Sequence, residues 1–244
     1  MNEQAFYSRW KEVAEGLAPF EMAQRAGAVA ETPGQIFTSG YQAAVRHTFP
    51  EVNHAGWCCF AVTEDRSPES AFPGVSLVDG KVSGFKTWIA AADCVELLVL
   101  KVGGGAEARY GTVLAKDPGV TIKLRPGKFL ADMSQGAAEF NQAEFVEFVE
   151  VPEVRTFRQY EPYYIYVAFL ARLAALELDS GDSRVGEIKD LALSALAEQI
   201  DLVQIDSLVS HLLDLMAQLG LELGSDWTTD KRLFTMYSSG IQRL

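Results

Sequence analysis

Apolar residues recur at three- and four-residue steps near the start of the chain, a spacing that places them on one side of a helix. The sequence therefore predicts helices over residues 3–30 and 36–47, separated by Pro33 and Gly34. The apolar stripe of the first helix consists of Phe6, Trp10, Val13, Leu17 and Phe20.

Between residues 56 and 152 this helical period disappears, and short apolar runs alternate with Gly, Pro and Asp residues that favour turns. Residues 144–151 alternate charged and apolar side chains and are the clearest strand of this part. The predicted strands are residues 95–102, 110–115, 120–124 and 140–151. Short strands separated by turn signals predict an antiparallel barrel or sandwich.

After residue 152 the helical period returns, and we expect the first three helices of this part to form a bundle. The leucine spacing of the third helix would also suit a contact between subunits. The predicted helices are residues 163–178, 185–200, 205–219 and 227–243, with Pro162 in the first turn of the first one. The predicted fold class is therefore α+β. Its parts are a short N-terminal helical segment (residues 1–55), a central β-domain (56–152) and a C-terminal helical bundle (153–244).

Composition narrows the classes of function. The chain has 244 residues, 48% of them hydrophobic, which is enough for a sizeable core. Its net charge of −12 disfavours sequence-independent nucleic-acid binding, because such binding needs Lys and Arg to neutralise phosphates. No signal peptide and no membrane span are recognised, so we expect a cytoplasmic protein. Cys58, Cys59 and Cys94 lack the paired spacing of a zinc site and are interpreted as buried thiols.

Two segments of the β-rich part end on residues that can contact a planar polar ligand. The first ends at Thr63-Glu64, and after a segment rich in Ser, Pro and Gly the second reads Gly-Phe-Lys-Thr-Trp-Ile-Ala over residues 84–90. This pattern resembles the central β-domain of the acyl-CoA dehydrogenase family. That domain carries Thr-Glu, a Gly/Ser-rich loop and then Gly-x-Lys-x-Trp-Ile-Thr.

The resemblance implies a shortened, divergent member with an acyl-CoA dehydrogenase-like fold. The expected function is that of an FAD-dependent oxidoreductase acting on a CoA- or carrier-linked acyl group. The implied flavin contacts are Thr63, Trp88, Ile89 and Ala90. The family has Thr at the position of Ala90, so one hydroxyl is missing. The family binds FAD partly through two segments of a neighbouring subunit, Arg-x-x-Phe-Gly and Gln-x-x-Gly-Gly. Residues 155–158 (Arg-Thr-Phe-Arg) resemble the first but lie too early in the chain and lack the Gly, and the second is absent.

The C-terminus also resembles the family, whose members end in Arg-Asp…Tyr-Glu-Gly-Thr…Ile-Gln-Arg. Asp230, Tyr237 and the Ile-Gln-Arg step at 241–243 match this ending. In many members the Glu removes the α-proton of the acyl thioester, but its position here is Ser238. A neutral hydroxyl cannot take that proton without a base of its own, so no catalytic residue is assigned.

Glu161 is a second candidate for the base, because some members of the family place theirs on the first helix of the C-terminal bundle. A structural explanation is also available. A Glu beside a Pro at a helix N-terminus interacts favourably with the helix dipole.

Three interpretations follow. The first is the oxidoreductase described above. The second is a catalytically inactive homologue that serves as a binding or partner subunit without flavin. In either case we expect a homodimer or a hetero-oligomer with a full-length dehydrogenase. The third is an unrelated β-barrel flanked by helices. Bound FAD would distinguish the first interpretation from the second.

Overall fold

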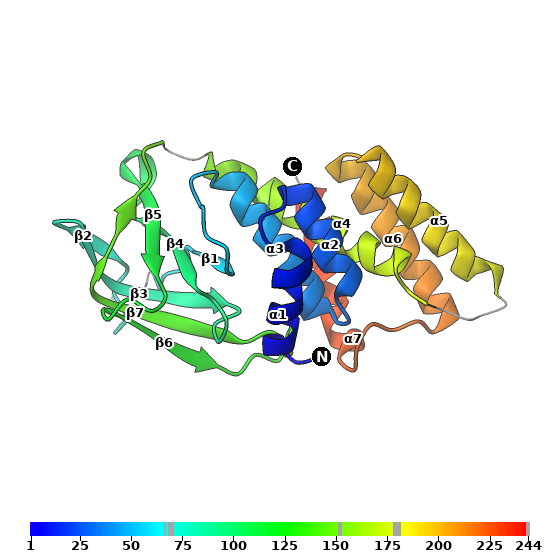
Figure 1. Ribbon diagram of the computed structural model, residues 1–244, viewed down its shortest axis with the longest axis horizontal. Coiled ribbons are helices and arrows are strands. Elements are labelled where there is room, and N and C mark those ends of the chain that lie inside the picture. Colours follow the sequence, from blue (N-terminus) through cyan, green and yellow to red (C-terminus); the bar gives the residue numbers. More distant parts are fainter. Residues whose placement is uncertain (66, 68–70, 151–152, 178–181, 243–244) are drawn as a thin grey trace.

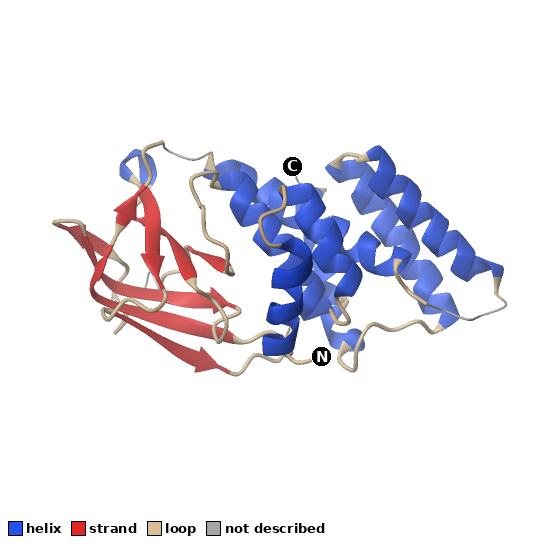
Figure 2. Ribbon diagram, in the orientation of Figure 1, coloured by secondary structure: helices blue, strands red, loops and turns tan. Residues whose placement is uncertain are grey.

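The computed structural model describes residues 1–65, 67, 71–150, 153–177 and 182–242. Strands lie at one end of an elongated molecule and helices at the other (Figure 1, Figure 2). The helices are α1 (Glu3–Ala14), α2 (Pro19–Val29), α3 (Pro33–Thr48), α4 (Val154–Ala174), α5 (Ser183–Glu198), α6 (Leu202–Leu219), α7 (Trp227–Asp230) and α8 (Arg232–Ile241), with a short 3-10 helix at Gly105–Glu107. The strands are β1 (Cys58–Ala61), β2 (Ser76–Val78), β3 (Lys81–Ala90), β4 (Leu97–Val102), β5 (Arg109–Leu114), β6 (Val120–Arg125), β7 (Gln135–Glu144) and β8 (Val146–Glu147).

The continuous helix expected over residues 3–30 is divided into α1 and α2. Gly16 follows α1 with a φ of 76°, in the left-handed region that favours glycine, and Pro19 occupies the first turn of α2. The second expected helix is α3. The hydroxyl of Thr32 accepts the backbone N–H of Gln35 and caps its N-terminus.

Helices α3 and α4 pack together at the centre of the helical half, and α2 packs against both. Gly40 of α3 has no room for a side chain, because a Cβ there would collide with the backbone of Ile165. Gly27 of α2 lies in the same way against the backbone of Ala168. These close approaches explain why glycine occupies two otherwise helical positions.

The strands form a sandwich of two four-stranded sheets, with the orders β1-β4-β5-β8 and β2-β3-β7-β6. The sandwich alternative is therefore right, and the described residues form no closed barrel. The expectation that all strands pair antiparallel is wrong for β1 and β4, which run parallel with Cys58 opposite Leu97. The chain forms β2 and β3 of the other sheet between these two strands, so it returns to β4 by a crossover and not by a hairpin.

The strand expected over residues 140–151 differs most from the structure. β7 begins before this stretch and ends within it, and β8 is only two residues long. The chain changes sheets between them, because β7 pairs with β3 and β6 whereas β8 pairs with β5. After β8 the Glu51 carboxylate accepts the N–H groups of Val149 and Glu150, both at 3.0 Å. These donors are thus satisfied outside any sheet.

Helix α4 begins at Val154, well before Pro162, so Pro162 is not in the first turn. It lies inside the helix, where it has no N–H for the carbonyl four residues earlier. The helix also ends earlier than expected, at Ala174. The helices expected over 185–200 and 205–219 are α5 and α6, and the one expected over 227–243 is divided into α7 and α8.

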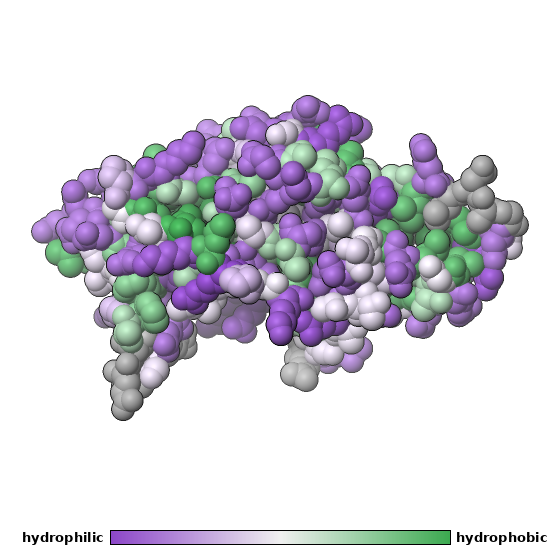
Figure 3. Space-filling view, turned by 90° about the horizontal axis from the view of Figure 1, so that it is seen from below, coloured by the Kyte–Doolittle hydropathy of each residue, from purple (hydrophilic) through white to green (hydrophobic). Residues whose placement is uncertain are grey.

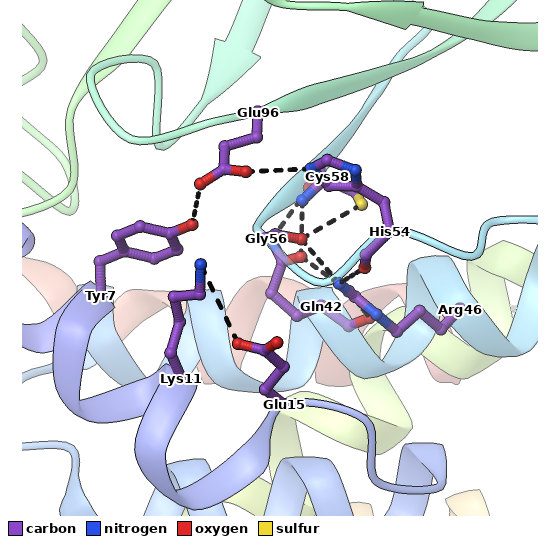
Figure 4. Close-up of polar contacts among 9 residues, drawn as sticks. All are labelled: Tyr7, Lys11, Glu15, Gln42, Arg46, His54, Gly56, Cys58 and Glu96. Carbon is purple, nitrogen blue, oxygen red and sulfur yellow. Dashed lines mark hydrogen bonds and ion pairs between the residues drawn. The ribbon is translucent and has the colours of Figure 1, made fainter.

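A polar cluster joins α1 and α3 to the first sheet (Figure 4). Arg46 of α3 donates to the carbonyl oxygens of His54 (3.0 Å) and Gly56 (2.8 Å). Glu96, which precedes β4, accepts a hydrogen bond from the Tyr7 hydroxyl of α1 and lies 3.1 Å from His54 Nε2. These contacts fix the helices relative to the β1-β4-β5-β8 sheet.

Apolar side chains reach the surface in two areas of the face seen in Figure 3. They gather over the sheets and again over α5 and α6, with mainly polar surface between the two areas. None of the described helices is long and apolar enough to cross a membrane.

Candidate active site

A cavity of about 400 Å³ lies where the β2-β3-β7-β6 sheet meets the helices. Its walls come from α3, β3, the segment between β6 and β7, the start of β7, α4 and α8. The lining residues are Phe37, Trp88, Phe129, Leu130, Met133, Gln135, Glu161, Leu233, Met236 and Tyr237. An apolar cavity with a few convergent polar groups is the usual form of a small-molecule site. Those groups here are an amide, a carboxyl and a phenol.

Trp88 forms part of the wall on the sheet side. It lies in β3 between Lys86 and Ile89, where the pairing with β7 shifts register and the regular alternation of side chains is interrupted. The indole Nε1 donates to Gln135 Oε1 at 3.2 Å, and the Phe37 ring packs edge-on with a centroid distance of 6.5 Å. The indole is thus held in place and half-buried.

Glu161 lines the cavity from α4, on the helical side. Burial raises the pKa of its carboxyl to about 7, while a hydrogen bond with the Tyr237 side chain acts to lower that pKa. A carboxyl that is close to half ionised at neutral pH is suited to general base catalysis. The helix-dipole explanation for Glu161 is wrong, because α4 begins at Val154 and Glu161 lies outside its first turn.

Ser238 is next to Tyr237 in α8 but does not line the cavity. Its Oγ donates to Asp206 Oδ2 of α6 at 3.0 Å. The hydroxyl of Tyr166, from α4, donates to the other oxygen of the same carboxylate at 2.8 Å. Ser238 is therefore engaged within the helical bundle and is not placed to take a proton from a molecule in the cavity.

The other three residues expected to contact flavin lie outside the cavity walls. Thr63 is exposed, and its carbonyl accepts the N–H of Thr87 at 2.8 Å. The side chain of Ile89 is fully buried in the core. Ala90 is also buried, and its N–H donates to Cys59 Sγ at 3.3 Å. Of the four, the structure brings Trp88 alone to the cavity.

The charged residues of the same two segments bind one another. Lys86 is 1% exposed, and its Nζ lies 2.5 Å from Glu64 Oε1 and 2.6 Å from the carbonyl of Lys101 in β4. Glu64 also accepts the N–H of Val75 at 3.1 Å. These bonds tie the chain after β1 to β3 and β4, so Glu64 and Lys86 stabilise the sandwich beside the cavity.

Three cationic side chains lie around the cavity walls. The guanidinium of Arg232 lies over the ring of Phe129, 4.5 Å from its centroid. Arg125 Nη1 is 3.5 Å from the carbonyl of Thr87, the neighbour of Trp88 in sequence. Lys128 directly precedes Phe129. None of the three forms a salt bridge within the described part of the chain, and acidic side chains lie in the same region, since Asp230 accepts the N–H of Leu130 at 2.8 Å.

Sequence patterns did not identify Phe37, Phe129, Met133 or Gln135 as cavity residues. They come from separate elements and share no motif. Phe37 lies in the helix expected over residues 36–47, and Gln135 lies between the strands expected over 120–124 and 140–151. The sequence signals that point to this cavity are the expected flavin contact Trp88 and the candidate base Glu161.

No protein-family model and no curated protein sequence matches the chain. Solved structures do match it. The prolyl acyl carrier protein oxidase AnaB has a TM-score of 0.59 and 11% identity, over 89% of this chain and 78% of that chain. An FAD-dependent dehydrogenase has a TM-score of 0.53 and 12% identity, over 83% and 74%. Butyryl-CoA dehydrogenase from Megasphaera elsdenii has a TM-score of 0.51 and 10% identity, over 93% and 80%.

The chain has the acyl-CoA dehydrogenase fold. The predicted α+β fold class is therefore confirmed, and the interpretation as an unrelated barrel is wrong. In this acyl-CoA dehydrogenase fold the cavity lies between the sandwich and the helices, and it brings together Trp88 and Glu161.

Proposed function

We propose that the chain is a flavin-dependent oxidoreductase that acts on an acyl group linked to CoA or to a carrier protein, with Glu161 as its base. The observation that carries this proposal is that the Trp88 indole and the Glu161 carboxyl line the same cavity. The first belongs to the β-domain motif and the second replaces the base missing at Ser238. The cavity thus holds one candidate residue for each part of the proposed chemistry.

The residues of the cavity fit the ring of a flavin. Trp88, Phe37 and Phe129 supply aromatic surface for a planar ring, and Gln135 supplies an amide for its polar edge. Arg125 and Arg232 supply positive charge for the phosphates of FAD or of a pantetheine-linked substrate. A bound flavin would provide a two-electron acceptor that takes the β-hydrogen of the acyl group as hydride.

Glu161 removes the α-proton in this proposal. Its carboxylate accepts the proton and becomes a neutral acid, which the apolar walls favour. A pKa of about 7 leaves much of the carboxyl ionised at neutral pH while making it a stronger base than an exposed Glu.

The substrate class follows from the cavity and from similar proteins. A cavity of about 400 Å³ is near the lower end of the range for ligand sites, roughly 300–1,000 Å³. Because the ring of a flavin would occupy part of this volume, we propose a small acyl group. Two of the similar structures are named for small acyl groups, the prolyl acyl carrier protein oxidase and the butyryl-CoA dehydrogenase. The unmatched FAD-binding segments lead us to propose that the working form is an oligomer.

The test begins with an absorption spectrum of the concentrated protein before and after addition of FAD. We expect stoichiometric flavin bands, and bleaching of those bands under anaerobic conditions on addition of a short acyl thioester. Trp88→Ala should lose the flavin while keeping the helical circular dichroism of the wild type. A colourless protein that does not bind added FAD would contradict the proposal. It would support the interpretation as a catalytically inactive homologue without flavin.

Glu161→Gln separates binding from chemistry. The variant should keep the flavin but slow its reduction by roughly 10²- to 10⁴-fold, the usual contribution of a general base. Glu153→Gln is a matched control, because Glu153 is exposed at the start of the same helix. Equal effects of the two substitutions would show that Glu161 is not the base.

A further inference from the structure

A short segment between β6 and β7 connects the two halves of the molecule beside the cavity. This segment, residues 129–134, is the bridging turn. Three of its side chains, those of Phe129, Leu130 and Met133, line the cavity. The carbonyl of Leu130 accepts the N–H of Met133 at 3.0 Å, which closes the turn. The path of the bridging turn therefore decides where one wall of the cavity lies.

Leu130 has a backbone conformation that a leucine rarely adopts. Its φ is 51°, in the left-handed region that favours glycine, and its side chain is buried. A bulky residue stays in this conformation only where its surroundings hold it there. The Leu130 N–H donates to Oδ1 of Asp230 at 2.8 Å, and Asp230 belongs to α7 of the helical half. This bond holds the strained residue directly.

Asp230 is buried beside the turn. It is 1% exposed, and its second oxygen, Oδ2, has no hydrogen-bond partner in the described part of the chain. A buried oxygen without a partner is destabilising, so the bond to Leu130 is the contact that explains why a carboxyl lies here. The Arg232 guanidinium, 4.5 Å from the ring centroid of Phe129, packs on the preceding residue of the turn. The C-terminal helices thus hold two successive residues of the bridging turn.

The bridging turn is also bonded to the sheet. The amide of Gln135 donates through Nε2 to the carbonyl of Phe129 at 2.7 Å, and through Oε1 it accepts the indole N–H of Trp88 at 3.2 Å. Reversing the amide would bring two donors together and two acceptors together, so these bonds fix its orientation. Consecutive contacts therefore lead from α7 through the bridging turn to the indole in β3.

We propose that Asp230 is a positioning residue for the cavity, which holds the bridging turn so that Gln135 orients the indole of Trp88. The proposal rests on the proposed function, in which this indole contacts a flavin. Asp230 itself lines no part of the cavity and acts through the turn. It matches the C-terminal motif without an assigned role, and the contact with Leu130 gives it one.

The test observes the indole N–H of Trp88 and needs neither flavin nor substrate. Protein labelled with nitrogen-15 at its four tryptophans gives one indole resonance for each, and Trp88→Phe assigns the relevant one. Gln135→Leu should shift that proton resonance upfield, because the indole loses its acceptor. Asp230→Ala should shift it in the same direction by a smaller amount, since the turn that holds Gln135 is then less firmly fixed.

Two variants act as controls. Asp230→Asn should leave the Trp88 resonance near its wild-type position, because the amide keeps an oxygen that can accept the Leu130 N–H. Asp226→Ala is the matched control, because Asp226 is an exposed carboxylate at the start of the same helix. It should leave the resonance unchanged. Circular dichroism establishes that each variant is folded before its spectrum is compared.

A second substitution tests the strain at Leu130. Glycine adopts a positive φ without support, so adding Leu130→Gly to Asp230→Ala should return the Trp88 resonance toward its wild-type position. Should Asp230→Ala alone fail to fold, the same addition should restore the fold. A double variant no better than Asp230→Ala would overturn the claim that Asp230 holds the strained turn.

Affinity for FAD is the second readout. Asp230→Ala should raise the dissociation constant for FAD by roughly 2- to 10-fold, the contribution of a well-oriented aromatic pair, while Asp226→Ala should not change it. A displaced Trp88 resonance with unchanged affinity for FAD would overturn the role of Asp230 in the cavity.

The resonances themselves decide whether Asp230 positions Trp88. An unchanged Trp88 resonance in folded Asp230→Ala protein would overturn the proposal, as would a shift confined to Trp227 of α7. A wild-type chain that binds no FAD would contradict the proposed function, and the four resonances would still show whether the path from Asp230 to Trp88 exists.

Discussion

The segment around Trp88 and the segment around Ser238 both resemble motifs of the acyl-CoA dehydrogenase family, yet the structure uses them differently. In β3 the motif residues occupy a cavity wall (Trp88) and a buried ion pair beside it (Lys86). In α8 the residue at the position of the family's base turns away into the bundle, and Glu161 of α4 lines the cavity instead. A motif can therefore keep its place in the fold while a carboxyl of another element lines the cavity.

The largest predicted effect tests whether the β-domain motif stabilises the fold. Lys86→Met should lower the free energy of unfolding by about 3 kcal/mol, because it leaves the Glu64 carboxylate without its buried partner. Urea unfolding followed by circular dichroism measures this. Lys123→Met is the control. Its pair with Glu139 is exposed, so the loss should stay below about 1 kcal/mol. Similar losses in the two variants would show that the Glu64–Lys86 pair has no special role.

A smaller effect tests whether α8 can still accept the family's base. Ser238→Glu should not restore a catalytic carboxylate, because position 238 faces Asp206 and not the cavity. It should lower the free energy of unfolding by about 2 kcal/mol, since two carboxylates then meet in a partly buried site. Ser239→Glu, on the exposed side, should change it by no more than about 0.5 kcal/mol. Faster flavin reduction in Ser238→Glu would contradict the placement of Ser238.

The pH dependence of stability gives the smallest effect. The pKa of Glu161 is about 7 in the folded chain and near 4.5 when it is unperturbed, so the folded state binds more protons between these values. The free energy of unfolding should therefore be greater at pH 5 and fall as the pH rises toward 7. Relative to Glu161→Gln, which does not titrate, the change should be roughly 1–2 kcal/mol. Parallel pH profiles for the two proteins would mean that the carboxyl is not perturbed.

Much of the fold could be predicted from sequence because periodicity is a local property. The change from helical to strand pattern and back, the helix at α3, and the positions of β4, β5 and β6 all follow from residues close together in the chain. The alternation over residues 144–151 predicted one continuous strand, which is wrong. A pattern of charged and apolar residues does not show where the chain passes from one sheet to the other. The parallel pairing of β1 with β4 depends on a crossover through a distant hairpin, which no local pattern records.

The site was harder to predict, because sequence patterns are local and the cavity is built from distant segments. Trp88 and Glu161 could be identified by resemblance, but their meeting depends on how the sandwich packs against α4. Thr63 has the motif's residue type and is nevertheless exposed, away from the cavity walls.

The central claim is that the base has moved from position 238 to Glu161. Exchange of the α-hydrogen of butyryl-CoA with solvent deuterium, followed by mass spectrometry in the presence of the FAD-loaded protein, tests it directly because exchange requires a base at that carbon. Wild type and Ser238→Ala should both catalyse exchange, and Glu161→Gln should lose it. Exchange that persists in Glu161→Gln, or disappears in a folded Ser238→Ala protein with Glu161 intact, would contradict the account.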